Sequence, residues 1–292
     1  MGEICAVGCA VVWAFAVILL KRSGETVSPI ALNLFRVTFS LPLLVATICI
    51  SGLAALPTVP ARDYLILVAS GILGIVISDT LFHKSLNLVG AGITAIVDTF
   101  YSPITVLLAF LFLGERIGLR AIIGMWLIMG AVLLSATLTP PPHRSRKQLI
   151  EGVMLGVLGL LFLGFGIVVA KPVLYRWPVL WVVGVRQAGS AVVLLCIAVV
   201  SPRRREFLGV WRPHRAWRRM IPATVLGSYL SLILWITGMK YTLASIAAIL
   251  NQSSTIFILV LSVLLLKEPL TRRKIVASVL AIAGVLLVSI RG

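Results

Sequence analysis

Four ionisable side chains lie deep within apolar stretches of this sequence: Arg36, Asp79, Asp98 and Arg186. Ionisable residues inside a membrane span mark functional sites by default, because burying a charge in hydrocarbon costs free energy that something must offset. Carboxylates in such places can carry protons or pair with cations, and arginines can bind anionic groups. His83, one helical turn after Asp79, adds a second group that could exchange protons.

Arg36, Asp79 and Asp98 are expected at one level of the membrane. Arg36 lies about seven residues into its apolar run, which is roughly 10 Å at 1.5 Å per residue, and the two aspartates lie at similar depths. One interpretation is a structural ion pair between Arg36 and either Asp79 or Asp98. The other is a gate or proton-coupling site, because one arginine cannot fully satisfy two carboxylates.

Arg186 mirrors Arg36 at an offset of 150 residues, but it lacks matching acids. Leu232 and Asn251 stand where the first half of the chain has its two aspartates. Three alternatives follow for Arg186. Its side chain could extend to the outer membrane interface, pair with an acid of the first half, or face a cavity and bind an anionic group such as a substrate carboxylate.

Polar and aromatic residues near these charges could complete a central pocket. Tyr101 follows Asp98 by one turn, and Asn251 and Gln252 mirror Asp98 and its neighbour. Two tryptophans could provide stacking surfaces, although packing or anchoring at the interface is the commoner role of each alone. The candidate substrate-binding residues are Trp13, Arg36, Asp98, Tyr101, Arg186, Trp235, Asn251 and Gln252. The candidate gate or proton-coupling residues are Arg36, Asp79, His83 and Asp98.

The composition places these residues in an all-α integral membrane protein. Hydrophobic residues make up 60% of the chain, charged residues 12%, and the mean hydropathy is +1.11. A soluble domain carries about 25% charged residues. The net charge of +17 could suggest nucleic-acid binding. The basic residues, however, lie in short turns between apolar runs, as in membrane proteins, so no nucleic-acid partner is expected.

The apolar runs predict ten transmembrane helices, because a spanning helix needs roughly 20 mostly apolar residues. The first run lacks a basic n-region and a cleavage site, which favours a retained helix over a signal peptide. Most Lys and Arg residues fall in the loops after alternate spans, which predicts that both termini are outside. The predicted spans are residues 4–20, 29–50, 64–83, 92–113, 120–138, 152–170, 178–200, 220–238, 243–266 and 274–290.

An internal repeat organises these spans. Residues 91–136 align without a gap on 244–289, with 14 of 46 positions identical, and Glu115 falls on Glu268. The predicted units are therefore a five-helix repeat over 1–138, a linker over 139–150 and a second five-helix repeat over 151–292. An odd number of spans inverts the second repeat relative to the first, as in many secondary transporters. Each of the two glutamates is expected to stabilise the N-terminus of the helix that follows it.

The chain resembles paired EamA domains of the drug/metabolite transporter superfamily over essentially its whole length. The motifs that carry the resemblance are Pro29 to Arg36, SPITVLLAFLFLGERIGLRAIIGMWLIMGAVLL (102–134) and TIFILVLSVLLLKEPLTRRKIVASVLAIAGVLLV (255–288). The resemblance implies ten helices in two inverted halves, and export or exchange of small metabolites or drugs across the inner membrane. One departure is that the proline at Pro103 becomes Ile256 in the second copy, so a kink is expected in the first copy only.

A secondary carrier is the favoured function, and two other classes stay open. One is a membrane enzyme with an acid–base group of Asp79, His83 and Asp98, and the other is a channel. The sequence has no HExxH motif, no nucleophile motif and no P-loop. The four cysteines form no CxxC pair, so no metal, cofactor or disulfide is expected. The expected partners are a small-molecule substrate and membrane lipid, and the expected state is a monomer or homodimer.

Overall fold

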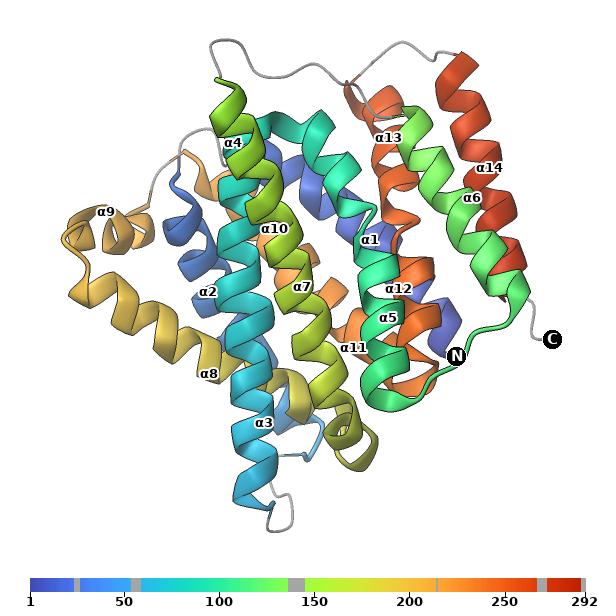
Figure 1. Cartoon of the computed structure of the whole chain (residues 1–292). Helices are drawn as coiled ribbons and strands as arrows, with labels where there is room; N and C mark the ends of the chain where they lie inside the picture. Colours follow the sequence, from blue (N-terminus) through green and yellow to red (C-terminus); the bar gives the residue numbers. More distant parts are fainter. Residues whose placement is uncertain (24–26, 54–58, 136–144, 214, 267–271, 290–292) are drawn as a thin grey trace.

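The protein is a multi-pass helical membrane protein in the computed structural model (Figure 1). The structure describes residues 1–292 except 24–26, 54–58, 136–144, 214, 267–271 and 290–292. Within these residues, seven helical runs are long and apolar enough to cross a membrane. Three further apolar helices, Leu119–Ser135, Ala244–Ile258 and Ile275–Ser289, are shorter. The predicted membrane class is therefore confirmed, and the number of ten spans stays a prediction.

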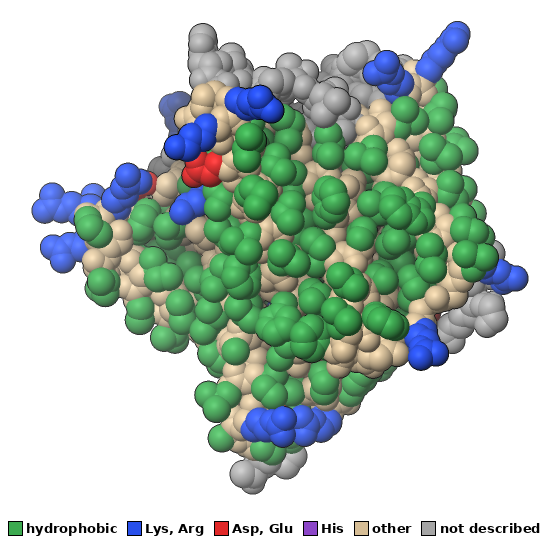
Figure 2. All heavy atoms as spheres, in the orientation of Figure 1, with side chains coloured by type: hydrophobic (Ala, Val, Ile, Leu, Met, Phe, Trp, Pro, Cys, Tyr) green, Lys and Arg blue, Asp and Glu red, His purple; other side chains and the backbone are tan. Residues whose placement is uncertain are grey.

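The surface of the molecule agrees with a lipid environment. Hydrophobic side chains cover the middle of the face seen in Figure 2, and Lys and Arg gather toward its edges. Large apolar side chains such as Leu65, Trp126 and Val192 are more than half exposed. A soluble protein rarely exposes a continuous apolar surface of this kind, whereas a bilayer solvates it.

The first repeat begins with two long helices and continues through two interrupted ones. Ser28 precedes Pro29 at the first position of the second helix, where the missing N–H of proline costs nothing. Gly90, with φ 76°, breaks the helical backbone inside α4, close to the expected boundary between the third and fourth spans. The elements are α1 (Gly2–Ser23), α2 (Pro29–Ile50), α3 (Ala61–Gly71), the π-helical η1 (Ile72–Ile77), α4 (Ser78–Asp98), α5 (Tyr101–Leu113) and α6 (Leu119–Ser135).

The first helix of the second half begins inside the segment expected to be a linker. Ser145 and Gln148 form a reciprocal cap: the Gln148 N–H donates to Ser145 Oγ at 3.2 Å, and the Ser145 N–H donates to Gln148 Oε1 at 3.0 Å. This capping box starts the helix at Arg146. The elements are α7 (Arg146–Arg176), α8 (Val179–Val200), α9 (Arg204–Leu208), η2 (Gly209–Trp211), α10 (Trp217–Thr224), the π-helical η3 (Val225–Ser231), α11 (Leu232–Tyr241), α12 (Ala244–Asn251), α13 (Ser254–Leu266) and α14 (Arg272–Ser289).

Helix irregularities recur at equivalent places in the two repeats. The π-helical segments η1 and η3 begin 153 residues apart, at Ile72 and Val225. Helix breaks follow α4 at positions 99–100 and α12 at positions 252–253, also 153 residues apart. The structural repeat therefore preserves features that sequence identity does not show.

The expectation of a kink in the first copy only is wrong, since both copies break. Proline is not required for the break. The Thr99 hydroxyl donates to the carbonyl of Ile96, and the Ser253 hydroxyl donates to the carbonyl of Leu250, each at 2.6 Å. Side-chain bonds of this kind compete with the helical hydrogen-bond ladder and favour a bend.

The two repeats interleave instead of forming separate bodies. The most extensive helix pairs join one repeat to the other: α4 with α7, α6 with α14, α2 with α8, and α1 with α11. The α4–α7 pair and the α11–α1 pair are equivalent under the repeat. Figure 1 shows α6 and α14 side by side at one edge and α9 at the opposite edge. The space between the repeats is therefore enclosed by helices of both.

Candidate substrate cavity

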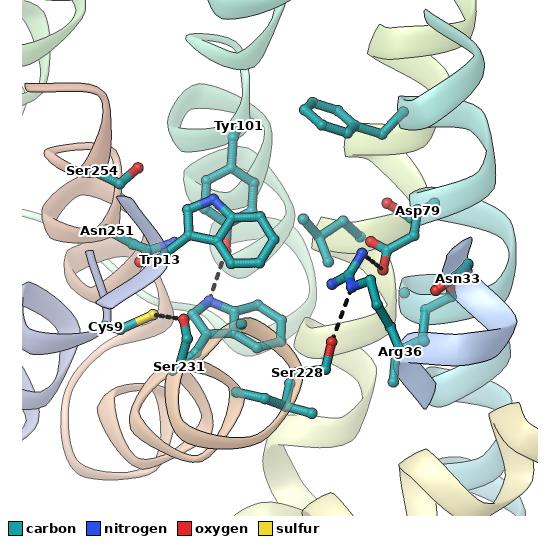
Figure 3. A pocket seen from close by; sticks show the side chains of 18 of the residues that line it. Cys9, Trp13, Asn33, Arg36, Asp79, Tyr101, Ser228, Ser231, Asn251 and Ser254 are labelled. Carbon is teal, nitrogen blue, oxygen red and sulfur yellow. Dashed lines mark hydrogen bonds and ion pairs between the residues drawn. The ribbon is translucent and has the colours of Figure 1, made fainter. Parts of the chain in front are cut away.

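A cavity of about 180 Å³ lies between the repeats (Figure 3). Its walls come from both halves of the chain, including the broken and π-helical segments. The sequence-predicted residues that line it are Trp13, Arg36, Asp79, Asp98, Tyr101, Arg186, Trp235, Asn251 and Gln252. His83 is not among the lining residues. The structure thus brings together nearly all the candidate residues, from positions up to 239 residues apart in the sequence.

Arg36 on α2 has several partners around its guanidinium group. Its Nε donates to Ser228 Oγ at 3.0 Å, and its Nη1 lies 3.5 Å from Asp79 Oδ2 and 3.3 Å from His83 Nε2. The guanidinium carbon lies 5.8 Å from the ring centroid of Trp13. Figure 3 shows Arg36 directed toward Asp79 and Ser228. Of the two ion pairs considered from the sequence, the pair with Asp79 is the one that forms.

Arg186 on α8 also lines the cavity, but its charge is not neutralised. Its side chain is buried, with only 1% of the residue exposed, so the alternative that it extends to the interface is wrong. Nη1 donates to Ser70 Oγ, and the guanidinium carbon lies 5.9 Å from the ring centroid of Trp235. Within the described residues no carboxylate forms an ion pair with Arg186, and its Nε has no acceptor. The close approach of α3, which supplies Ser70, requires Gly71, because a Cβ there would lie 2.4 Å from the Arg186 carbonyl oxygen.

The broken helices present Asp98 and its neighbours to the cavity. Gln252 Nε2 donates to Asp98 Oδ2 across a long 3.5 Å contact, and Ser102 Oγ donates to Gln252 Oε1 at 3.1 Å. Trp235 Nε1 donates to the Tyr101 hydroxyl at 3.2 Å. No cation pairs with Asp98 among the residues that the structure describes. Breaks in membrane helices expose backbone ends and polar side chains at the binding sites of transporters.

The three residues considered as an acid–base group for an enzyme have different hydrogen-bond partners. Asp79 and His83 both lie against Arg36, whereas Asp98 contacts Gln252 on the second repeat. In the described part of the chain, no group of three His, Cys, Asp or Glu side chains is placed to hold a metal ion. The geometry is that of a polar binding cavity in an apolar bundle.

Several polar residues of the cavity were not singled out from the sequence. Cys9 Sγ lies 3.2 Å from Ser231 Oγ, and Asn33 Nδ2 donates to the carbonyl of Ile75 at 2.8 Å. The repeat could have indicated one pair of them, because Ser78 and Ser231 are 153 residues apart and both line the cavity. The other overlooked lining residues with polar side chains are Gln187, Ser228 and Ser254.

Glu115 lies outside the cavity and joins the two repeats. Its carboxylate accepts hydrogen bonds from Lys171 Nζ at 2.7 Å, the Ala244 N–H at 2.9 Å and the Ser245 N–H at 3.0 Å. Glu115 therefore caps α12 of the second repeat, not the following helix α6 as expected, because interleaving brings that other N-terminus closer. Burial alone raises the pKa of Glu115, but the bonds from Lys171, Ser245 and Ala244 outweigh it and hold the pKa below its ordinary value. The matching residue, Glu268, lies outside the described residues.

Helical repeats that interleave around a buried polar cavity are an arrangement found in many transporters with internal repeats. The chain belongs to the EamA-like transporter family, whose model matches residues 1–137 and 150–290. This family is part of the drug/metabolite transporter superfamily. No curated protein matches the chain. One solved protein, described only as a crystal structure, superposes with a TM-score of 0.80 over 99% of this chain and 96% of its own. The two sequences are 16% identical, so this likeness shows the fold alone.

Proposed function

We propose that the protein is a secondary transporter that exports or exchanges small metabolites or drugs across the inner membrane. The observation that carries this proposal is the cavity between the repeats, whose walls include equivalent positions of both halves, such as Ser78 with Ser231 and Asp98 with Asn251. Inverted repeats around a site near the middle of the membrane can expose that site to each side in turn by rocking. The family membership supports transport as the general activity.

Arg36 and its partners are the proposed gate. Arg36 on the first repeat donates to Ser228 on the second, and the same guanidinium group holds Asp79 and His83. A contact that joins the repeats at the cavity wall must break or rearrange when one repeat moves against the other. The strength of this cluster would then set the balance between the two states of the carrier.

Asp98 is the proposed proton-coupling residue. It lines the cavity and has a single long contact with the amide of Gln252, so a change in its protonation alters no ion pair among the described residues. We expect Asp98→Asn to impair transport driven by a pH gradient while leaving folding intact. Asp98→Glu, which keeps a carboxylate at this position, is the control. An Asp98→Asn protein whose transport keeps its pH dependence would remove Asp98 from this role.

Counterflow in proteoliposomes tests the proposed function. Vesicles loaded with an unlabelled amino acid, nucleoside or cationic drug are given the labelled compound outside, and a carrier accumulates label transiently against its own gradient. We expect accumulation with at least one solute, and its loss in Leu232→Trp, which fills the cavity. The control Leu230→Trp places the same side chain two residues away at a partly exposed position. Equilibration without overshoot indicates a channel, and chemical conversion of the solute indicates an enzyme.

A further inference from the structure

Arg186 is a buried cation for which the described structure supplies no anion. The residue is 1% exposed, its Nε lacks an acceptor, and its contacts are the neutral hydroxyl of Ser70 and the ring of Trp235. The Ser70 hydroxyl in turn donates to the carbonyl of Gly166 at 2.5 Å, so it serves Arg186 as an acceptor only. A charge removed from water costs free energy unless it is paired. Ser70 and Trp235 offset part of that cost and leave the positive charge uncompensated.

The two residues that contact the Arg186 guanidinium group are themselves held in place by the fold. Ser70 reaches it because α3 approaches α8 closely at Gly71. Trp235 is itself fixed by its hydrogen bond to the Tyr101 hydroxyl, at the start of α5. The guanidinium group is therefore held at the wall of the cavity from two sides. Pre-organised donors of this kind bind a ligand without the entropic cost of ordering a free side chain.

We propose that Arg186 binds the carboxylate of a small monoanionic substrate. The inference rests on the proposed function and specifies its substrate class. The planar guanidinium group matches a carboxylate with two parallel hydrogen bonds, a geometry that an ammonium group cannot provide. A single negative charge neutralises the one cation of the cavity that lacks a carboxylate partner among the described residues.

Charge and size restrict the substrate further. Arg36, the second cation of the cavity, already pairs with Asp79, and the carboxylate of Asp98 lines the same space. A phosphate dianion or a dicarboxylate would meet one available cation and a nearby negative charge, so it is disfavoured. The volume of about 180 Å³ equals that of about six water molecules in the liquid, so it suits a small substrate. Apolar walls formed by Leu160, Leu163 and Leu232 suit a substrate with a hydrophobic remainder.

The test uses benzoate and its neutral isostere benzamide on the purified full-length protein. Binding is measured by isothermal calorimetry, and heat stability with ligand provides a second reading. We expect benzoate to bind, and benzamide to bind at least about tenfold more weakly, as the loss of a charge-assisted bond predicts. Arg186→Gln should weaken benzoate binding by about tenfold or more. Arg186→Lys, which keeps the charge and loses the fork, should weaken it less. Arg205→Gln, which removes an exposed cation, should bind benzoate like wild type.

Each other outcome overturns the proposal. Equal affinity for benzoate and benzamide, unchanged benzoate binding in Arg186→Gln and Arg186→Lys, or no benzoate binding up to about 50 mM, would each show that Arg186 is not a carboxylate site. Size-exclusion profiles of the variants are compared first, so that a folding defect is separated from a binding defect, and Arg186→Lys serves as the second variant. Failure of the proposed transport function would give a different experimental result. Benzoate would then bind through Arg186 while counterflow is absent for every solute.

Discussion

Arg36 and Arg186 occupy the same place in their repeats and have opposite surroundings. Each lies seven residues after the first residue of its helix, at Pro29 in α2 and Val179 in α8. Each also lies just under 6 Å from a tryptophan ring centroid. Arg36 has a carboxylate, an imidazole and a hydroxyl as partners, whereas the described residues give Arg186 one hydroxyl.

This difference shows how a duplicated scaffold can divide two tasks. A compensated charge holds helices together, and removing one partner leaves the other exposed to an apolar environment. An uncompensated charge in the same scaffold contributes little to folding and is available to a ligand. At the position equivalent to Asp79 the second repeat has Leu232, which cannot pair with an arginine.

The largest effect on stability is expected at the buried ion pair between Glu115 and Lys171. Lys171 is buried, and Glu115 is its one acidic partner among the described residues. Glu115→Gln should therefore lower the free energy of unfolding by about 3 kcal/mol. The same substitution at Glu151, which is exposed on α7, is the matched control and should leave thermal unfolding in detergent unchanged.

The same cluster predicts a pH dependence. Because the pKa of Glu115 is lowered in the folded protein, its contribution to stability is present above the ordinary value of 4.5 and is lost as the pH falls through the folded value. Thermal unfolding of wild type should show this loss below pH 4.5, and Glu115→Gln should show a flatter profile there. Identical profiles for the two proteins would mean that the pair does not form.

The next largest effect is a difference in stability between variants of the two arginines. Arg36→Gln strands Asp79, which is partly accessible, and should cost about 2 kcal/mol of stability, somewhat less than a fully buried pair. Arg186→Gln removes an uncompensated charge and should leave stability unchanged or slightly raised. Melting temperatures of the two variants without ligand measure the difference. If Arg186→Gln is destabilised as much as Arg36→Gln, the contrast between the sites is wrong.

A smaller effect, on benzoate binding, is expected when an acid is introduced near Arg186. Leu232→Asp places a carboxylate at the position equivalent to Asp79, on the wall that Arg186 shares. An internal partner for Arg186 should compete with benzoate and weaken its binding about tenfold, or about 1.4 kcal/mol. Leu232→Asn is the neutral control. Equal benzoate affinity in both variants would mean that benzoate does not bind at Arg186.

The sequence is sufficient to predict the membrane class, the repeat and the charged residues that line the cavity. Apolar run lengths carry the membrane signal, and charges inside those runs single out Arg36, Asp79, Asp98 and Arg186. These features depend on residue type and spacing along one helix. They do not require knowledge of which helices are neighbours.

Neighbour relations account for the features that the sequence does not reveal. Glu115 caps α12 and not α6 because the repeats interleave, and no periodicity in one segment encodes that arrangement. The burial of Arg186 likewise depends on α3 and α11, which belong to different repeats. The break after α12 arises from the Ser253 hydroxyl and local turns without a proline, a signal too weak to recognise in an apolar run.

Accessibility of the cavity from each side of the membrane tests the alternating-access mechanism most directly. A single cysteine is placed at Leu232 in a chain whose four native cysteines are replaced by serine. The protein is reconstituted into vesicles in one orientation or the other, and each preparation receives a membrane-impermeant thiol reagent from outside. We predict that the cysteine reacts from either side when each is tested alone, and that benzoate slows both reactions. Reaction from one side only, under every condition and with every ligand, would contradict alternating access between the two repeats.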